Sequence, residues 1–374
     1  MFPLMKRYVS TEELMEWNPD PLKESLSLSA KQYKDSVKTI DKIIGEVVRN
    51  DISEPQYNII NELLHIGIFE NSGALVDEIY LQIMRRINGD KHSEVLWKLM
   101  ICVTDTFPPS KGMSPYILKW FNSFNLTEST QFMIRAIKRC HCNFNVFKIS
   151  GPRAYKTTIE DVKFWIDESI NKFPIFGNDL EEIYQDSSLI KDLDGVQLPI
   201  ILIKLTEMIR GLNGFKKEGV FRISGDLQQV FQLKILLSKY PENIDLKLFK
   251  DASVPCSLLK LWMRVLRSPL IPDDLYTQFL IFRKSPNKLT SLLEEMPKPN
   301  YNVIYYICSF LIELSAEEHQ EFTKMSLDNF SMIFAPCFMR CPLTSSALEI
   351  LRRSSEEREV LREIFNHFIS IKKK

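Results

Sequence analysis

The sequence predicts an all-α protein built from two helical bundles in tandem. Almost every segment places apolar residues three or four positions apart, which is the spacing of one helix face. No stretch shows a convincing alternation of period two, the pattern of a half-buried strand. Glycine is scarce at 12 of 374 residues, about 3% against a typical 7%, which disfavours Gly-rich phosphate loops and twisted β architectures.

The first hundred residues are expected to form four helices. Ser27 or Ser29 is expected to cap the first helix, and Pro55 suits the first turn of the second. Phe107-Pro108-Pro109 ends the fourth, because proline cannot continue a helix. The apolar periodicity places these helices at Ser29–Val48, Pro55–Ile66, Leu75–Ile87 and His92–Thr106.

A joint between the two bundles is predicted at residues 167–179. This stretch contains Pro174 and Gly177 and interrupts the helical periodicity. Beyond it, Asp226 is expected to open a helix, and the later helices carry clear apolar faces. Their expected ranges are Leu227–Tyr240, Val254–Arg267 and Glu356–Ser370.

Composition excludes several classes of protein. The 48 basic and 48 acidic residues leave no net charge, which disfavours a general nucleic-acid binder. Seven cysteines are an odd number and too few for a disulfide framework in this length, so they are read as reduced thiols of a cytoplasmic protein. The most apolar stretches, Leu198–Leu205 and Ile304–Leu314, are too short to span a bilayer, so any membrane contact is expected to be peripheral.

Residues 107–156 carry a strong local positive charge, with eight basic side chains against one acidic. Such a segment attracts acidic partners over long range, or it is a solvated face whose counter-charges lie elsewhere. Both readings stay open. The basic residues are Lys111, Lys119, Arg135, Lys138, Arg139, Lys148, Arg153 and Lys156.

The sequence offers little for metal binding or for nucleophilic catalysis. Cys140-His141-Cys142 places three potential ligands side by side, but adjacent helical residues point in different directions and cannot converge on one ion. The expected arrangement is two buried thiols beside a solvated histidine. No nucleophile elbow, H-E-x-x-H motif or P-loop occurs, so no metal site is predicted.

Residues 218–225 place one arginine in a short apolar loop between two glycines. Arg222 lies in this loop, just ahead of the helix that Asp226 opens. Apolar anchors on both sides can present a guanidinium in a fixed direction, and its planar fork suits phosphate oxygens. From spacing alone, a solvated or ion-paired arginine is the commoner arrangement.

Two other segments carry polar groups at positions that invite attention. Lys260, Arg264 and Arg267 fall at i, i+4 and i+7 and predict a basic stripe on one helix face, although such a stripe is more often merely solvated. Asn329 lies in an apolar helix that Pro336 is expected to interrupt. The simpler role for Asn329 is a hydrogen bond to its own backbone.

Taken together, these three segments resemble the RhoGAP domain, over about residues 174–370. Phe176-Gly177-x-x-Leu180 resembles the usual entry to that domain. The order and the spacing of the motifs are kept. Residues 219–225 resemble G-[IV]-F-R-x-S-G, residues 259–270 resemble L-K-x-x-L-R-x-L-P-x-P-L, and residues 329–336 resemble N-L-A-x-x-x-x-P.

The first half, about residues 5–166, resembles the myosin-tail-homology (MyTH) domain. Residues 77–82 resemble its D-E-I-Y-x-Q motif, and residues 107–110 with Pro115-Tyr116 resemble its F-P-P-S region. Gly151-Pro152-Arg153 resembles its closing segment. A MyTH domain followed directly by a RhoGAP domain is similar to the Vilse-type GTPase activators.

The resemblance implies an activator of a Rho/Rac-type small GTPase, with Arg222 as the catalytic finger inserted in trans. Lys260 and Arg264 would brace the finger loop and meet the GTPase, and Asn329 would bond a GTPase switch backbone. Gly219, Phe221, Ser224 and Gly225 would support the finger. GTP and Mg²⁺ would belong to the partner, so no cofactor is expected in this chain, and it lends a residue rather than turning over a substrate of its own.

Two alternatives are weighed against this activator. A non-catalytic scaffold would bind the GTPase without stimulating it, but such scaffolds can lack the arginine that is present here. A metal-dependent hydrolase is the weakest reading, for want of ligands. The resemblance of the MyTH half implies attachment to microtubules or to cytoskeletal cargo, and the basic 107–156 segment would meet acidic tubulin tails or anionic lipid.

Overall fold

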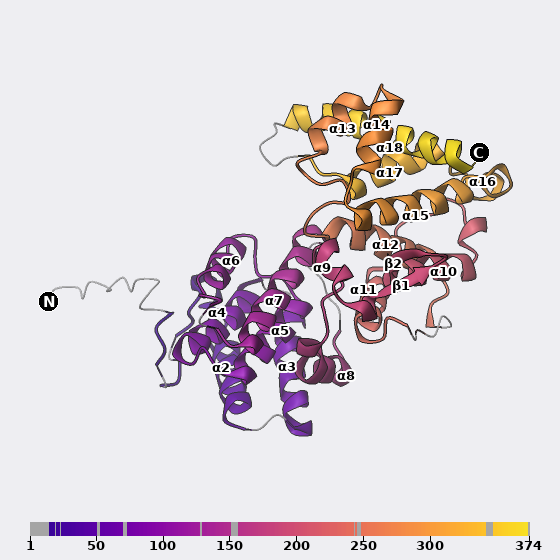
Figure 1. Ribbon diagram of the computed structural model, residues 1–374. Helices are drawn as coiled ribbons and strands as arrows, with labels where there is room; N and C mark the ends of the chain where they lie inside the picture. Colours follow the sequence, from indigo (N-terminus) through magenta and orange to yellow (C-terminus); the bar gives the residue numbers. More distant parts are fainter. Residues whose placement is uncertain are drawn as a thin grey trace. The chain divides into compact units, whose positions relative to one another are not determined.

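The computed structural model describes residues 15–18, 20–22, 24–50, 53–69, 73–127, 129–150, 156–242, 244, 248–341 and 347–372. The chain divides into two compact units, Met1–Lys172 and Phe173–Lys374. Both units are helical, which confirms the predicted all-α class (Figure 1). The division falls inside the predicted 167–179 joint.

The N-terminal unit is organised around helix α5. Its residues from Leu96 to Thr106 are buried apart from Lys98, and α5 packs against both α4 and α7 (Figure 1). Trp97 of α5 stacks on Trp120 of α6, with ring centroids 5.8 Å apart. The helices are α2 (Lys34–Arg49), α3 (Glu54–Phe69), α4 (Gly73–Gly89), α5 (Glu94–Thr106), α6 (Ser114–Asn122), α7 (Gln131–Ser150) and α8 (Ile159–Lys163), with short turns η1 (Leu28–Ala30), η2 (Phe164–Glu168) and η3 (Ser169–Asn171).

The first long helix begins later than predicted. Neither Ser27 nor Ser29 caps it; α2 starts at Lys34 after Tyr33, and residues 28–30 form a separate 3₁₀ turn. The hydroxyls of Ser27 and Ser29 bond each other at 2.6 Å, and the backbone N–H of Ser27 donates to the Glu78 carboxylate at 2.8 Å. That bond holds the chain ahead of α2 against α4.

The D-E-I-Y-x-Q motif ties three separate segments to helix α4. Its polar side chains are buried, so each needs a partner inside the protein. All of them find backbone groups, which explains why these residue types occur on an otherwise apolar helix. Asp77 accepts from Ser110 N at 2.7 Å, Glu78 accepts from Leu26 N and Ser27 N at 3.0 and 2.8 Å, Tyr80 donates to Phe107 O at 2.8 Å, and Gln82 donates to Val37 O at 3.3 Å.

The C-terminal unit places α17 at its centre, packed on α12, α15 and α18 (Figure 1). The elements before the arginine loop are α9 (Leu180–Tyr184), η4 (Ser187–Leu189), β1 (Ile190–Leu193), β2 (Val196–Pro199), α10 (Ile200–Gly211) and η5 (Gly214–Lys216). Those after it are α11 (Leu227–Lys239), α12 (Ser253–Val265), α13 (Tyr276–Phe282), α14 (Pro286–Glu294), α15 (Lys298–Leu314), α16 (Glu317–Thr323), α17 (Leu327–Phe338) and α18 (Ala347–Lys372).

The expectation of no strand was wrong at one place. Strands β1 and β2 form an antiparallel hairpin in which Leu193 faces Val196. Asp194 and Gly195 connect them with φ of +52° and +83°, the positive values that a two-residue hairpin turn requires. The Asp-Gly pair was therefore the signal, and the strands are too short for their alternation to be seen.

Helix α17 passes through Pro336, contrary to the expected interruption. It continues to Phe338 before ending at Met339. Proline removes one N–H and therefore leaves the carbonyl of Met332 without its helical partner. Met332 is 57% exposed, so this carbonyl lies on the face where water can satisfy it.

Candidate functional site: an arginine loop in the C-terminal unit

The loop that carries Arg222 is tied to the neighbouring helices by its backbone. The N–H of Gly219 donates to the carbonyl of Thr323 at the end of α16, at 2.8 Å. Within the loop, the N–H groups of Arg222 and Ile223 both donate to Gly219 O, at 2.8 and 2.9 Å. Gly219 has φ of +67°, a conformation that costs glycine little. The loop therefore turns tightly at a fixed place.

Phe221 anchors the loop in the core. Its side chain is fully buried among three rings, with centroids 4.9 Å from Phe334, 6.1 Å from Phe330 and 6.4 Å from Phe310. Phe221 also has φ of +64°, which costs a non-glycine residue roughly 1–2 kcal/mol. Burial of a phenylalanine is worth about as much or more, so the aromatic cluster holds a strained backbone in place.

Gly225 closes the loop against the start of helix α12. Its N–H donates to the hydroxyl of Ser257 at 2.9 Å. A side chain at this position would put Cβ 2.7 Å from Ser253 O and 2.8 Å from the Cα of Val254. Only glycine allows the two backbones to approach so closely. The second glycine of the motif is therefore needed for packing.

Arg222 itself is exposed, between buried Phe221 and exposed Ile223 and Ser224. No carboxylate among the described residues forms an ion pair with it. Ile223 beside it is 48% exposed, which places apolar surface next to the guanidinium. Arg222 is therefore a solvent-exposed cation on a fixed loop, and its Nη2 lies toward Gly219, 3.3 Å from where a Cβ at Gly219 would stand.

Lys260 supports the loop from helix α12. Its ammonium donates to the carbonyl oxygen of Phe221, directly before Arg222. Burial lowers the pKa of Lys260, and the positive charge of Arg264, one turn further along α12, lowers it further. Arg264 is exposed. The predicted pair therefore consists of one cation turned to the loop and one turned to solvent.

Arg267 does not belong to this basic stripe. Helix α12 ends at Val265, so Arg267 no longer follows the helical spacing that predicted it. Its guanidinium pairs with Asp179 and lies 3.1 Å from Glu182. Both carboxylates lie at the start of helix α9, where they tie the end of α12 to it.

The Asn329 side chain accepts a hydrogen bond from nearby backbone, which is the simpler role expected from the sequence. Its Oδ1 accepts from Ser326 N at 3.0 Å and from Ser326 Oγ at 3.1 Å, and Ser326 Oγ accepts from Asn329 N at 3.3 Å. This capping box begins α17. Asn329 is half-buried, and its amide nitrogen is not used by the cap. The cap fixes the side chain and leaves the amide donor for another acceptor.

Sequence reasoning missed the partners that hold this site together. The Thr323 carbonyl, the Ser257 hydroxyl and the ring of Phe334 are far from Arg222 along the chain. Cys256 and Cys337 are buried thiols close to Lys260, and burial raises the pKa of each to about 12, so both are neutral. Only the flanking glycines and Phe221 gave a local signal.

The basic 107–156 segment is divided between surface and interior. Lys111, Lys119, Arg135 and Lys156 are exposed, and Lys138 is half-buried. The side chain of Lys148 and the whole of Arg153 lie outside the described residues. These positions lie in the N-terminal unit, whereas the arginine loop lies in the C-terminal unit.

Arg139 does not belong to the predicted basic patch, because it is buried. It is 5% exposed, and its guanidinium donates to Ser169 O at 2.8 Å and Lys172 O at 3.3 Å. The group also lies over the ring of Phe164, 5.9 Å from its centroid. A buried cation with internal partners cannot attract a ligand, so Arg139 is structural.

The residues that the structure describes contain no cluster of three or more His, Cys, Asp or Glu able to hold a metal. Cys140 and Cys142 are buried, as expected for core thiols, and burial raises the pKa of Cys140 to about 12. None of the described helices combines the length and the apolar character that crossing a membrane requires.

Comparison with known domain families identifies both halves of the chain. Residues 199–343 match the RhoGAP domain, and residues 60–163 match the MyTH4 domain. Both matches lie inside the ranges predicted from the resemblance, 174–370 and 5–166. The chain therefore contains a MyTH4 domain followed by a RhoGAP domain, and the arginine loop lies in the second.

Curated relatives share parts of the chain. GTPase activating protein homolog 4 of Dictyostelium discoideum is 32% identical over 60% of this chain and 24% of its own length. GTPase activating protein homolog 3 of the same organism is 30% identical over 46% of this chain and 13% of its own length. Human unconventional myosin-IXa is 26% identical over 42% of this chain and 6% of its own length. The chain thus spans a quarter or less of these relatives.

The solved structures that are similar to this chain include the following two. Human Rho GTPase activating protein 15 superposes with a TM-score of 0.47 at 18% identity, covering 57% of this chain and 97% of that structure. The BH domain from GRAF, the GTPase regulator associated with focal adhesion kinase, gives 0.41 at 18% identity over 46% and 93%. The similarity to the Vilse-type proteins stays a prediction.

Proposed function

We propose that this protein activates a Rho-family GTPase by inserting Arg222 into the partner's nucleotide site. One observation carries the proposal: Arg222 is exposed on a loop that is fixed at Gly219, Phe221 and Gly225. The RhoGAP match and the GTPase-activating relatives support it. GTP and Mg²⁺ belong to the partner in this mechanism.

The chemistry follows from the charge that moves during GTP hydrolysis. Negative charge spreads over the γ-phosphate oxygens and the leaving oxygen, and a guanidinium placed beside them stabilises it. Fixing the loop beforehand means that little conformational entropy is lost when Arg222 docks. In related systems an arginine supplied in trans accelerates hydrolysis roughly 10³–10⁵-fold.

Each neighbouring residue has a distinct part in this proposal. Lys260 sets the direction of the loop through Phe221 O. Arg264 meets acidic groups of the GTPase, and Asn329 donates its amide to a switch backbone. Exposed Ile223 covers the site and excludes water, which strengthens the electrostatic effect. The chain lends one catalytic group and turns over no substrate itself.

Single-turnover GTP hydrolysis by Rho-, Rac- and Cdc-type GTPases tests the proposal. Arg222→Ala should remove nearly all of the acceleration, and Arg222→Lys should recover little, because an ammonium lacks the planar fork. Arg267→Ala is the matched control, since it removes a guanidinium whose partners are Asp179 and Glu182. Equal acceleration by wild type and Arg222→Ala would reject the finger.

The same assay separates an activator from a scaffold. If the wild-type chain binds a GTPase tightly without accelerating hydrolysis, the scaffold function holds. Binding that survives in Arg222→Ala while acceleration is lost supports the activator, because one guanidinium supplies rate more than affinity.

For the MyTH4 unit we propose attachment to an acidic cytoskeletal partner through exposed Lys111, Lys119, Arg135 and Lys156. The MyTH4 match and the myosin-IXa relative support a cytoskeletal link. Co-sedimentation with microtubules should be strongest at low salt, since screening weakens exposed charges. Absence of binding at low salt would reject this attachment, and binding only to anionic vesicles would assign the surface to lipid.

A further inference from the structure

A large groove in the N-terminal unit is not used by the functions above. Its volume is about 1120 Å³, and it is lined by Trp17, Asn18, residues 20–22, helix α2, the end of α4 and the start of α5. None of the described basic residues from 107–156 lines it. Ligand pockets commonly measure about 300–1,000 Å³, so the groove can hold a sizeable group.

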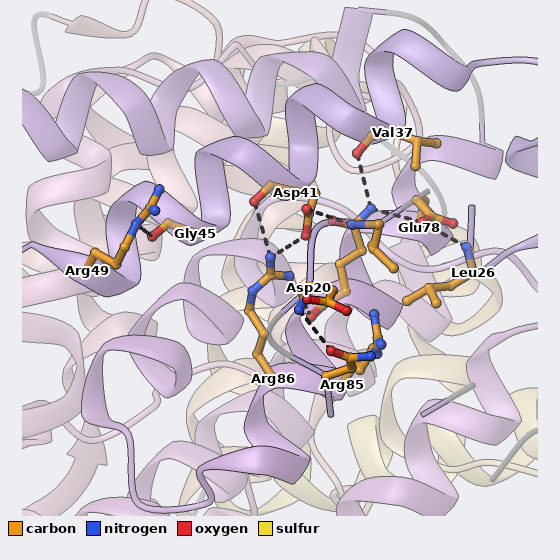
Figure 2. A network of polar contacts seen from close by, with 12 residues as sticks. Asp20, Leu26, Val37, Asp41, Gly45, Arg49, Glu78, Arg85 and Arg86 are labelled. Atoms are coloured by element: carbon orange, nitrogen blue, oxygen red, sulfur yellow. Dashed lines mark hydrogen bonds and ion pairs between the residues drawn. The ribbon is translucent and has the colours of Figure 1, made fainter. Parts of the chain in front are cut away.

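The groove carries more positive than negative side chains. Five lining residues are cations, Lys38, Lys42, Arg49, Arg85 and Arg86, and three are acids, Asp20, Asp41 and Asp90. Figure 2 shows that Asp41 is already engaged, because it pairs with Arg86. The Asp41 carboxylate also accepts from Leu22 N at 3.2 Å. The other four cations form no ion pair with an acid among the residues that the structure describes.

Arg85 is the clearest case of a cation without a carboxylate. Its Nε donates to Glu16 O at 2.8 Å, and no described carboxylate forms an ion pair with it. Burial lowers the pKa of Arg85, and the positive charge of its neighbour Arg86 lowers it further. Among the described residues, Arg85 and Arg86 thus have one ion-paired carboxylate, Asp41 with Arg86, and a net positive charge remains for an anion to meet.

Helix α2 adds a cationic edge and an apolar floor. Lys38, Lys42 and Arg49 are exposed and form no ion pair with any described acid, and Arg49 donates only to Gly45 O, at 3.0 Å. Gly45 leaves the floor open, since a Cβ there would meet nothing closer than Arg49 Nη2 at 3.9 Å. Trp17 and Val48 expose 40% and 37% of their surfaces to the same groove.

We propose that this groove binds an acidic peptide segment of a partner protein. Carboxylates of the peptide would pair with Arg85, Lys42 and Arg49, and an apolar side chain would lie over Gly45 beside Trp17 and Val48. A compact phosphate headgroup would use the cations and leave the apolar floor empty. The cationic edge, the apolar floor and the large volume of the groove together favour a peptide.

The test uses the full chain and a fluorescein-labelled peptide of four Glu-Glu-Leu repeats, followed by fluorescence anisotropy. We expect saturable binding that weakens as salt is raised. Lys42→Glu and Arg49→Glu should each weaken it about tenfold or more, because each replaces an attraction by a repulsion. Lys34→Glu makes the same charge change at an exposed position of α2 outside the groove and should leave binding unchanged.

Two further arms keep the proposal open to refutation. Gly45→Leu fills the floor without changing charge, on a helix that tolerates leucine, and should abolish binding while α2 stays folded. Equal loss in Lys34→Glu, or loss confined to Lys111→Glu with Lys119→Glu, would overturn the proposal. Binding of inositol hexaphosphate or anionic vesicles that is lost in Lys42→Glu and Arg49→Glu, with no binding of the peptide, would also overturn it.

Discussion

The ammonium of Lys260 donates a hydrogen bond to the carbonyl oxygen of Phe221, the residue directly before Arg222. The peptide plane that contains this carbonyl also contains the Arg222 nitrogen. The bond therefore fixes the plane from which the Arg222 side chain departs. Because Phe221 is held by its own buried ring, the lysine and the aromatic cluster act on the same peptide from two sides.

Lys260→Met should slow GTP hydrolysis by the partner about 10–100-fold. A hydrogen bond from a charged donor contributes about 1.5–3 kcal/mol, and here that energy orients the finger. Thermal unfolding should show only a small change in stability, because the loss of the donor to Phe221 O is offset by removing the cost of burying a charge. Single-turnover assays and a melting curve on the same sample give both values.

A double variant separates orientation from direct contact. If Lys260 acts through the loop, Lys260→Met should add almost nothing once Arg222→Ala has removed the finger. Additive losses would mean that Lys260 has a role of its own at the GTPase, independent of Phe221 O.

Gly225→Ala should destabilise the C-terminal unit by about 1–3 kcal/mol and reduce activation of the GTPase. The added Cβ would lie 2.7 Å from Ser253 O, and two backbones must separate to admit it. Gly45→Ala is the matched control, because Cβ there meets only Arg49 Nη2 at 3.9 Å. That change should stabilise the protein by about 0.5–1 kcal/mol. Urea unfolding of both variants checks the opposite signs.

Helix type and helix faces were predictable because they depend on local periodicity. Val230, Phe231, Trp262 and Met263 are buried, as their spacing in the sequence indicated. The start of α2 was not predictable from its serines, since the hydroxyls of Ser27 and Ser29 bond each other and Glu78, some fifty residues away, takes the N–H of Ser27. Helix ends depend on such distant acceptors, and spacing alone does not reveal them.

The sequence resemblance named the candidate site residues, but the contacts that hold them in place could not be predicted. The resemblance named Arg222, Lys260 and Asn329, and their roles toward a GTPase remain predictions. The positive φ of Phe221 is set by three rings from α15 and α17 and has no local signature. Counting charges along residues 107–156 failed at Arg139, because charge in a sequence does not distinguish a surface cation from a buried one.

Arg139→Lys should destabilise the N-terminal unit by about 1–3 kcal/mol without weakening microtubule co-sedimentation. Nη1 of Arg139 donates to both Ser169 O and Lys172 O, and the shorter lysine side chain ends before that position, so at least one of the two carbonyls loses its donor. Arg135→Lys, on the exposed face of the same helix, should stay within about 0.5 kcal/mol of wild type. A selective loss of co-sedimentation in Arg139→Lys, with stability unchanged, would contradict the buried assignment.

Glu78→Gln should change how stability depends on pH. Burial raises the pKa of Glu78 above its ordinary 4.5, against the lowering effect of bonds from Gln82, Ser27 and Leu26. The folded state therefore keeps the proton to higher pH than the unfolded chain. The unfolding free energy of the wild type should accordingly fall as pH rises from 4.5 through the raised value, and the fall is complete above it.

The glutamine variant has no proton to lose, so the difference in unfolding free energy should move in its favour as pH rises. The change is at most about 1.4 kcal/mol for each pH unit within that window. Below pH 4.5 the wild type should be equal or more stable, because both side chains are then neutral. Urea titrations at several pH values measure the difference. A difference that stays constant with pH would mean that Glu78 titrates alike in the folded and unfolded chains.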